Sequence, residues 1–90
     1  MTFAMEENYI MISFENTHAA MQAEKLLSQT LNVATMPTLR SVTQSCGISL
    51  RLAAEDYEQA RIKMAASGIA PALYAIYLVD IHKNPLQLSQ

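Results

Sequence analysis

Residues 9–20 read YIMISFENTHAA and change from strand-like to helix-like spacing within a few positions. Over 9–14 the apolar side chains alternate with a period of two, which predicts a β-strand. The apolar residues that follow recur at helical spacing, so we expect a helix over 17–31, with Asn16 or Thr17 as its N-cap. Ile10, Ile12 and Phe14 share one face of this strand, and Tyr9, Met11 and Ser13 share the other.

The rest of the chain continues this alternation of strands and helices. Strands are expected over 33–38, 47–53 and 72–80, and a helix over 54–67. Pro37 has no N–H to donate, so its strand should lie at an edge of the sheet or end there. Strand, helix, strand, strand, helix, strand is the order of the split βαβ, ferredoxin-like fold. It predicts an α+β sandwich whose four-stranded antiparallel sheet has the order 4-1-3-2, with both helices on one face.

Length and composition restrict the class of protein. Ninety residues suit one domain, which we place at 1–80, followed by a polar tail at 81–90. Six basic and eight acidic residues give a net charge of −2 without runs of like charge, which argues against a nucleic-acid or membrane-surface partner. No apolar stretch approaches the roughly 18 residues of a membrane span, and the first residues lack a signal-peptide pattern. With one cysteine and no internal disulfide, we expect a reduced, cytoplasmic protein.

Cys46 is the residue best suited to chemistry. In the predicted topology, the start of the first helix and the connection 38–45 meet at one end of the sheet. Cys46 ends this connection and should lie near the helix N-terminus, which lowers the pKa of a thiol. Gly47 leaves room for a ligand to approach the sulfur. The alternative is a structural cysteine, because Cys46 shares its strand face with Ile48 and buried cysteines act as small hydrophobes.

Other residues are weaker candidates for a chemical role beside Cys46. Arg40 lies in the same connection and is the nearest candidate cation, whereas Arg51 should lie on the opposite strand face. His18 could serve as a base, although a helix N-terminus disfavours a charged imidazole. Two histidines and one cysteine lack the spacing of a metal site, and two glycines make no phosphate loop, so we expect neither metal nor cofactor. The strand at 47–53 has no aromatic residue on which RNA bases could stack.

Most of 9–80 follows one pattern, made of FENTHAA at 14–20, EKLL at 24–27, Pro37, Arg40, SCG at 45–47 and LR at 50–51. In this pattern the chain resembles the selenium/sulfur carrier-like family of small bacterial proteins. The resemblance implies that Cys46 holds sulfur or selenium as a persulfide or selenosulfide and passes it between donor and acceptor proteins. It implies a carrier more than a turnover enzyme. The residues expected to stabilise the anionic terminus are Arg40, Ser45, Gly47, Thr17 and Asn16.

Two other functions fit the same residues. The chain could be an interaction or oligomerisation module with a structural cysteine, since the uncovered sheet face and the apolar residues on both sides of 72–79 allow a homodimer. Cys46 could also be a redox-sensing thiol that is capped by glutathione or by a second chain. Accessibility of the thiol separates the module from the other two functions. Retention of a persulfide separates the carrier from the sensor.

Overall fold

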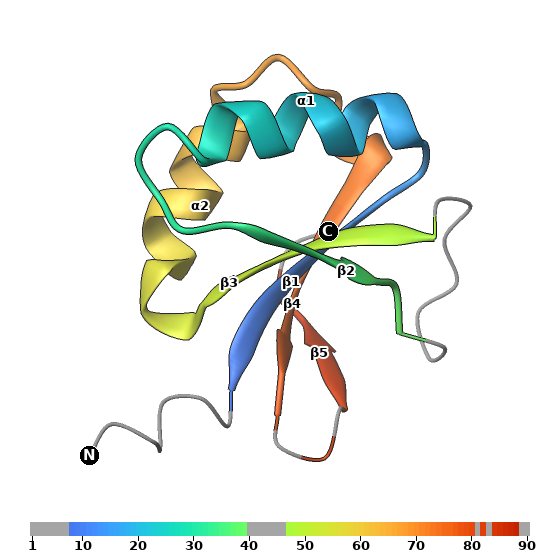
Figure 1. Cartoon of the computed structure of the whole chain (residues 1–90), viewed down its shortest axis with the longest axis vertical. Helices are drawn as coiled ribbons and strands as arrows, with labels where there is room; N and C mark the ends of the chain where they lie inside the picture. Colours follow the sequence, from blue (N-terminus) through green and yellow to red (C-terminus); the bar gives the residue numbers. More distant parts are fainter. Residues whose placement is uncertain (1–7, 40–46, 81, 83, 89–90) are drawn as a thin grey trace.

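The protein is an α+β structure in which two helices pack on a five-stranded antiparallel sheet (Figure 1). The computed structural model describes residues 8–39, 47–80, 82 and 84–88. In chain order the elements are β1 (Tyr9–Phe14), α1 (Thr17–Leu27), β2 (Ala34–Pro37), β3 (Ile48–Ala53), the 3-10 turn η2 (Ala54–Asp56), α2 (Tyr57–Ala65), the 3-10 turn η3 (Pro71–Leu73), β4 (Tyr74–Val79) and β5 (Pro85–Gln87).

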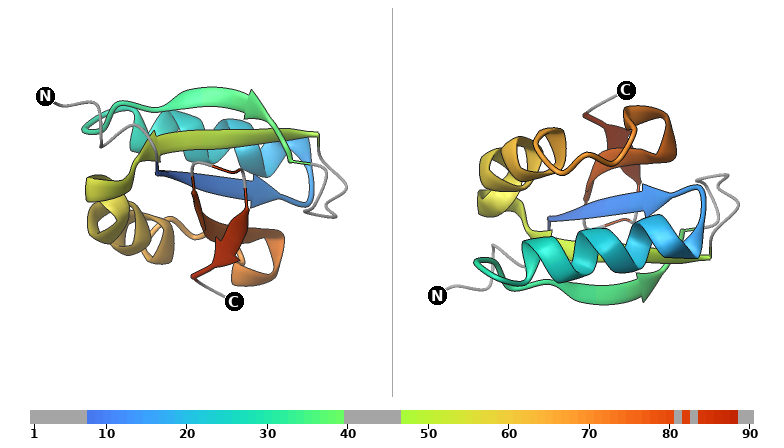
Figure 2. Two further views of the ribbon diagram at one scale, coloured as in Figure 1. Left: turned by 90° about the horizontal axis from the view of Figure 1, so that it is seen from below. Right: turned by 90° about the horizontal axis from the view of Figure 1, so that it is seen from above.

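The sheet has five strands, in the order β2-β3-β1-β4-β5, so the expectation of a four-stranded sheet was wrong. The added strand comes from the tail: β5 pairs with β4, and the twist of the sheet carries both out of the plane of β2 and β3 (Figure 2). Asp80 holds the connecting turn, because its Oδ1 accepts the N–H groups of His82 and Asn84 at 2.9 Å each. These backbone donors lower the pKa of Asp80 below its ordinary value, and the N–H of Asn84 has the largest effect.

The main core lies between the sheet and the two helices. Ile10, Ile12 and Phe14 point into it from β1, as the alternation predicted, and each is at most 1% exposed. Ile12 is flanked by Leu50 of β3 and Ile76 of β4. The helices contribute the small or flexible side chains that fill the rest: Ala19, Ala20, Ala23, Leu27, Ala60 and Met64.

The other face of β1 is also buried. Tyr9, Met11 and Val79 form a second cluster, packed against the half-buried Met36, Leu39 and Tyr77. Arg51 lies on this face, with its guanidinium 4.3 Å from the centre of the Tyr9 ring, a cation–π contact. The sequence placed Arg51 on the strand face away from the helices, and the structure agrees.

Both helices are shorter than the spacing suggested. The first ends at Leu27 rather than at residue 31, although Thr30 and Leu31 still donate their N–H groups to the Leu27 carbonyl at 3.2 and 2.9 Å. The second begins at Tyr57 because the preceding residues form the tighter η2 turn. After α2, Gly68 adopts φ +87°, a conformation that glycine reaches without the strain of a Cβ.

Candidate functional site

One end of the molecule brings together α1, β2 and β3, as the topology predicted. The start of α1 and the start of β3 share a small hollow of about 70 Å³, lined by Thr17 and Met21 on one side and by Thr35 and Ile48 on the other. The end of β2 is tied to the same place, since the Thr38 N–H donates to the Gly47 carbonyl at 3.0 Å. This end is therefore where residues from distant parts of the chain meet.

The sequence-predicted site residues divide into two groups. Cys46, Arg40 and Ser45 lie outside the described residues, so their predicted roles stay predictions. Gly47 and Thr17 are exposed and lie at this end of the molecule. Among the described residues that are not its chain neighbours, none has an atom within 4 Å of a Cβ added to Gly47.

Asn16 has a defined structural role. It adopts an extended conformation before α1, and its Oδ1 accepts the N–H of Ala19 at 2.7 Å. Of the two N-cap candidates in the sequence, Asn16 and Thr17, the N-cap is therefore Asn16. This bond satisfies one of the helix-end N–H groups that would otherwise lack a partner. The first turn of α1 contains no acidic side chain, so no carboxylate in that turn neutralises the positive end of the helix dipole.

Sequence reasoning did not find the apolar surface beside Gly47. A second hollow of about 370 Å³ is lined by Met36, Pro37, Gly47 and Ile48, together with Thr35. Ile48 was expected to face the core, yet 42% of it is exposed at the start of β3, where it is opposite Pro37 at the end of the edge strand β2. The signal available in the sequence was Pro37, which marks β2 as an edge strand.

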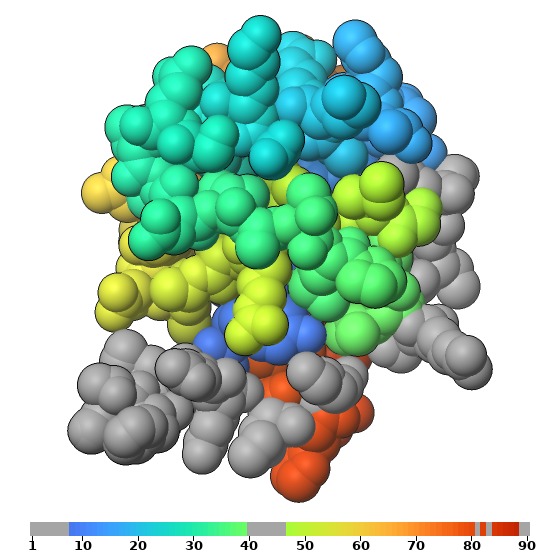
Figure 3. Space-filling view, in the orientation of Figure 1, coloured from blue at the N-terminus to red at the C-terminus, as the bar shows by residue number. Residues whose placement is uncertain are grey.

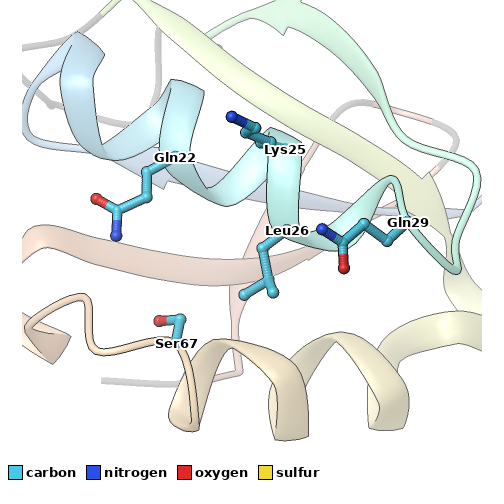
Figure 4. A pocket seen from close by; sticks show the side chains of 5 residues that line it. All are labelled: Gln22, Lys25, Leu26, Gln29 and Ser67. Atoms are coloured by element: carbon cyan, nitrogen blue, oxygen red, sulfur yellow. The ribbon is translucent and has the colours of Figure 1, made fainter.

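A further hollow of about 230 Å³ lies between α1 and the end of α2, where Leu26 and Ser67 face each other (Figure 4). Gln22, Lys25 and Gln29 complete its lining. Ser67 is already used to end the helix: its Oγ donates to the Met64 carbonyl at 2.6 Å and accepts the Ile69 N–H at 3.0 Å. Among the described residues that line this hollow, Lys25 is the one with an ionisable side chain. The lining therefore contains no pair of groups suited to acid–base chemistry or metal binding.

Two buried hydroxyls on the sheet face away from the helices differ in their bonding. Ser49 Oγ lies 2.7 Å from Thr38 Oγ1, in hydrogen-bond contact. Ser13 is opposite Ser49 in the β1–β3 ladder and is fully buried, but no described residue hydrogen-bonds to its Oγ. A buried hydroxyl without a partner has lost its hydration without compensation.

Replacing Ser13 with Ala should therefore raise the free energy of unfolding by about 1 kcal/mol, since the variant removes an unpaired buried hydroxyl. Ser49→Ala is the matched control: it should lower the same free energy by about 1 kcal/mol, because it breaks the bond to Thr38. Urea unfolding followed by circular dichroism measures both. Equal losses in the two variants would mean that the Ser13 hydroxyl has a partner.

Comparison with known families identifies the chain. The model of the family described as "Putative Se/S carrier protein-like" matches residues 8–75, from the start of β1 into β4. The protein belongs to this Se/S carrier-like family. The match includes the segment that contains Cys46 and ends before β5. No curated protein and no solved structure matches the chain.

Two features are absent from the described part of this Se/S carrier-like protein. None of its helices has the length and apolar character needed to cross a membrane. In the same part of the chain, no three His, Cys, Asp or Glu side chains are grouped so that they could hold a metal ion.

Proposed function

We propose that this protein carries sulfur or selenium on Cys46 and transfers it between a donor and an acceptor protein. The observation that carries the proposal is the family match over residues 8–75, which includes the chain's single cysteine. A carrier thiol must be reachable by two partners. Gly47, the next residue in the chain, is exposed, and no described residue apart from its chain neighbours would touch a Cβ added to it, which supports this requirement.

The transfer step needs no external oxidant or reductant. The Cys46 thiolate attacks the terminal sulfur of a persulfide on the donor; a new S–S bond forms at Cys46 while the donor's S–S bond breaks, and the donor leaves as a thiolate. The same exchange with a selenosulfide would deliver selenium. The acceptor's thiolate then repeats the attack on the terminal atom held by Cys46.

The anionic terminal atom would be stabilised by groups at the α1 end of the molecule. We assign this role to the guanidinium of Arg40, to Ser45 and the Gly47 backbone, and to the start of α1 at Asn16 and Thr17. The capping bond from Ala19 N–H to Asn16 fixes the position of the helix start. The positive end of the helix dipole at that start stabilises a nearby negative charge. Within this proposal the protein works in the reducing cytoplasm of a bacterium, where a single thiol stays available.

Intact mass spectrometry after reaction with a cysteine desulfurase and free cysteine tests the function. We expect the mass of one added sulfur atom, or of one selenium atom when selenocysteine is the source, and its loss on treatment with a thiol reductant. A protein of unchanged mass would contradict the carrier function. In a parallel reaction with glutathione disulfide, a glutathione adduct on a protein that accepts no sulfur from the desulfurase would instead favour the redox-sensing thiol.

A further inference from the structure

β2 is the last strand at one edge of the sheet, and no described strand pairs with its outer side. Its atoms lie at the surface of the face shown in Figure 3. Thr38 donates its N–H to the Gly47 carbonyl, so Thr38 and Gly47 form a hydrogen-bonded pair of the antiparallel ladder. Such pairs alternate with non-bonded ones along a strand. Met36 therefore bonds toward β3, whereas the backbone groups of Thr35 and Pro37 point outward. Because Pro37 has no N–H, the outward donor within β2 is that of Thr35.

The opposite edge of the sheet is protected in a similar way. Asp80 N–H bonds to the Asn84 carbonyl and Leu88 N–H to the Ile76 carbonyl, and the same alternation turns the backbone of Pro85 outward from β5. A proline at an outward position removes a donor that another chain could use. The edge of β2 follows the same pattern: Pro37 has no outward N–H to offer, whereas Thr35 keeps both groups and no residue from Ala34 to Pro37 is charged.

Apolar side chains surround this edge on the side of the helices. Met21 of α1 is 64% exposed and Ile48 of β3 is 42% exposed, and both line the hollow that Thr35 shares. Large exposed apolar side chains next to an unpaired strand are typical of a surface that another chain covers.

We propose that β2 pairs antiparallel with β2 of a second copy of this chain, joining two five-stranded sheets into one. The edge is complementary to itself when Thr35 lies opposite Thr35 of the second copy. Two hydrogen bonds then form between the two Thr35 residues, and each Val33, just before the strand, donates its N–H to a Pro37 carbonyl. A register centred on Pro37 would have no donor at its centre, so the proline disfavours that register relative to the one centred on Thr35.

The side chains agree with this pairing. Directly opposed threonines and other β-branched residues are favourable neighbours across antiparallel strands. The pairing places Thr35 against Thr35 and Val33 against Pro37, so that no charged side chain meets its own copy within the strand. It also brings two copies of the exposed Met21 and Ile48 to the same seam, where they exclude water from one another.

Thr35→Pro tests the proposal because it removes the outward N–H while leaving the bonds of β2 to β3 in place. We expect sedimentation velocity to show a concentration-dependent dimer for the natural chain. For Thr35→Pro the dissociation constant of the dimer should be at least about 30-fold larger, because two hydrogen bonds are lost. Thr35→Val is the control: it keeps the N–H and the β-branched shape, and it should dimerise like the natural chain. Should Thr35→Pro fail to fold, Thr35→Lys, which sets like charges opposite each other, should weaken the dimer instead.

Amide hydrogen exchange gives a readout within the natural chain. Protection of the Thr35 amide should rise with protein concentration, whereas the Met36 amide, which points toward β3, should be protected at all concentrations. A natural chain that stays monomeric up to millimolar concentration would overturn the proposal and would leave the edge for an extended strand of another protein. A dimer unaffected by both Thr35→Pro and Thr35→Lys would also overturn it.

Discussion

Replacing Cys46 with Ser is expected to abolish loading of sulfur or selenium, the largest functional effect that we predict. A serine hydroxyl at neutral pH is neither an anion nor a sulfur atom, so it can form no S–S or S–Se bond with the transferred atom. After reaction with a cysteine desulfurase, intact mass spectrometry should show the unmodified mass of the variant. Far-UV circular dichroism should show the same helix and strand content as the natural chain.

Ser45→Ala is the matched control for this experiment. It changes the neighbouring residue by one oxygen atom and keeps the thiol, so it should still accept one sulfur atom, although more slowly if Ser45 stabilises the charged terminus. Loading that persists in Cys46→Ser would exclude Cys46 as the carrier residue. Since the chain has no second cysteine, the added atom would then be bound without a protein thiol.

The fold could be predicted from the sequence where one physical signal dominates. In β1 the alternation placed Ile10, Ile12 and Phe14 on one face, and these three side chains are buried together in the main core. Asn16 was identified as a candidate N-cap by its position before the helical spacing, and it makes the capping bond. Each of these signals depends only on residues that are close together in the chain, so it can be recognised in a single sequence.

The features that were missed depend on contacts between distant residues. The strand at Pro85–Gln87 has little apolar content of its own and forms because the turn at Asp80 brings it back to β4. Ile48 matches its core-facing neighbours in the sequence, yet it is exposed at the start of β3, opposite the end of the edge strand β2. The outward direction of Thr35 requires the register between β2 and β3, which the sequence alone does not supply.

The candidate functional residue was chosen by different reasoning. Cys46 was selected because it is the single cysteine, precedes a glycine and follows a long connection near a helix start. The family match supports that selection through the residues around it, from the start of β1 to β4. The described geometry adds the exposure of Gly47 and the capped start of α1.

Truncating Ile12 should produce the largest loss of stability that we predict. Ile12 is fully buried at the centre of the sheet, between Leu50 and Ile76 on the neighbouring strands. Ile12→Val removes one methylene group and should lower the free energy of unfolding by about 1 kcal/mol; Ile12→Ala should lower it by about 2–5 kcal/mol, because a cavity is added to the lost transfer free energy. In a domain of this size each kcal/mol corresponds to about 4–8 °C in Tm.

Ile62→Ala is the control for this series, because it removes the same atoms from a helical side chain that is 56% exposed. Its free energy of unfolding should change by no more than about 0.5 kcal/mol, since little apolar surface is lost from the interior and alanine is the better helix former. Urea unfolding of the three variants beside the natural chain measures the series. If Ile12→Ala costs no more than Ile12→Val, the centre of the sheet can collapse around the missing atoms. An equal loss in Ile62→Ala would mean that the outer face of α2 is buried against another chain.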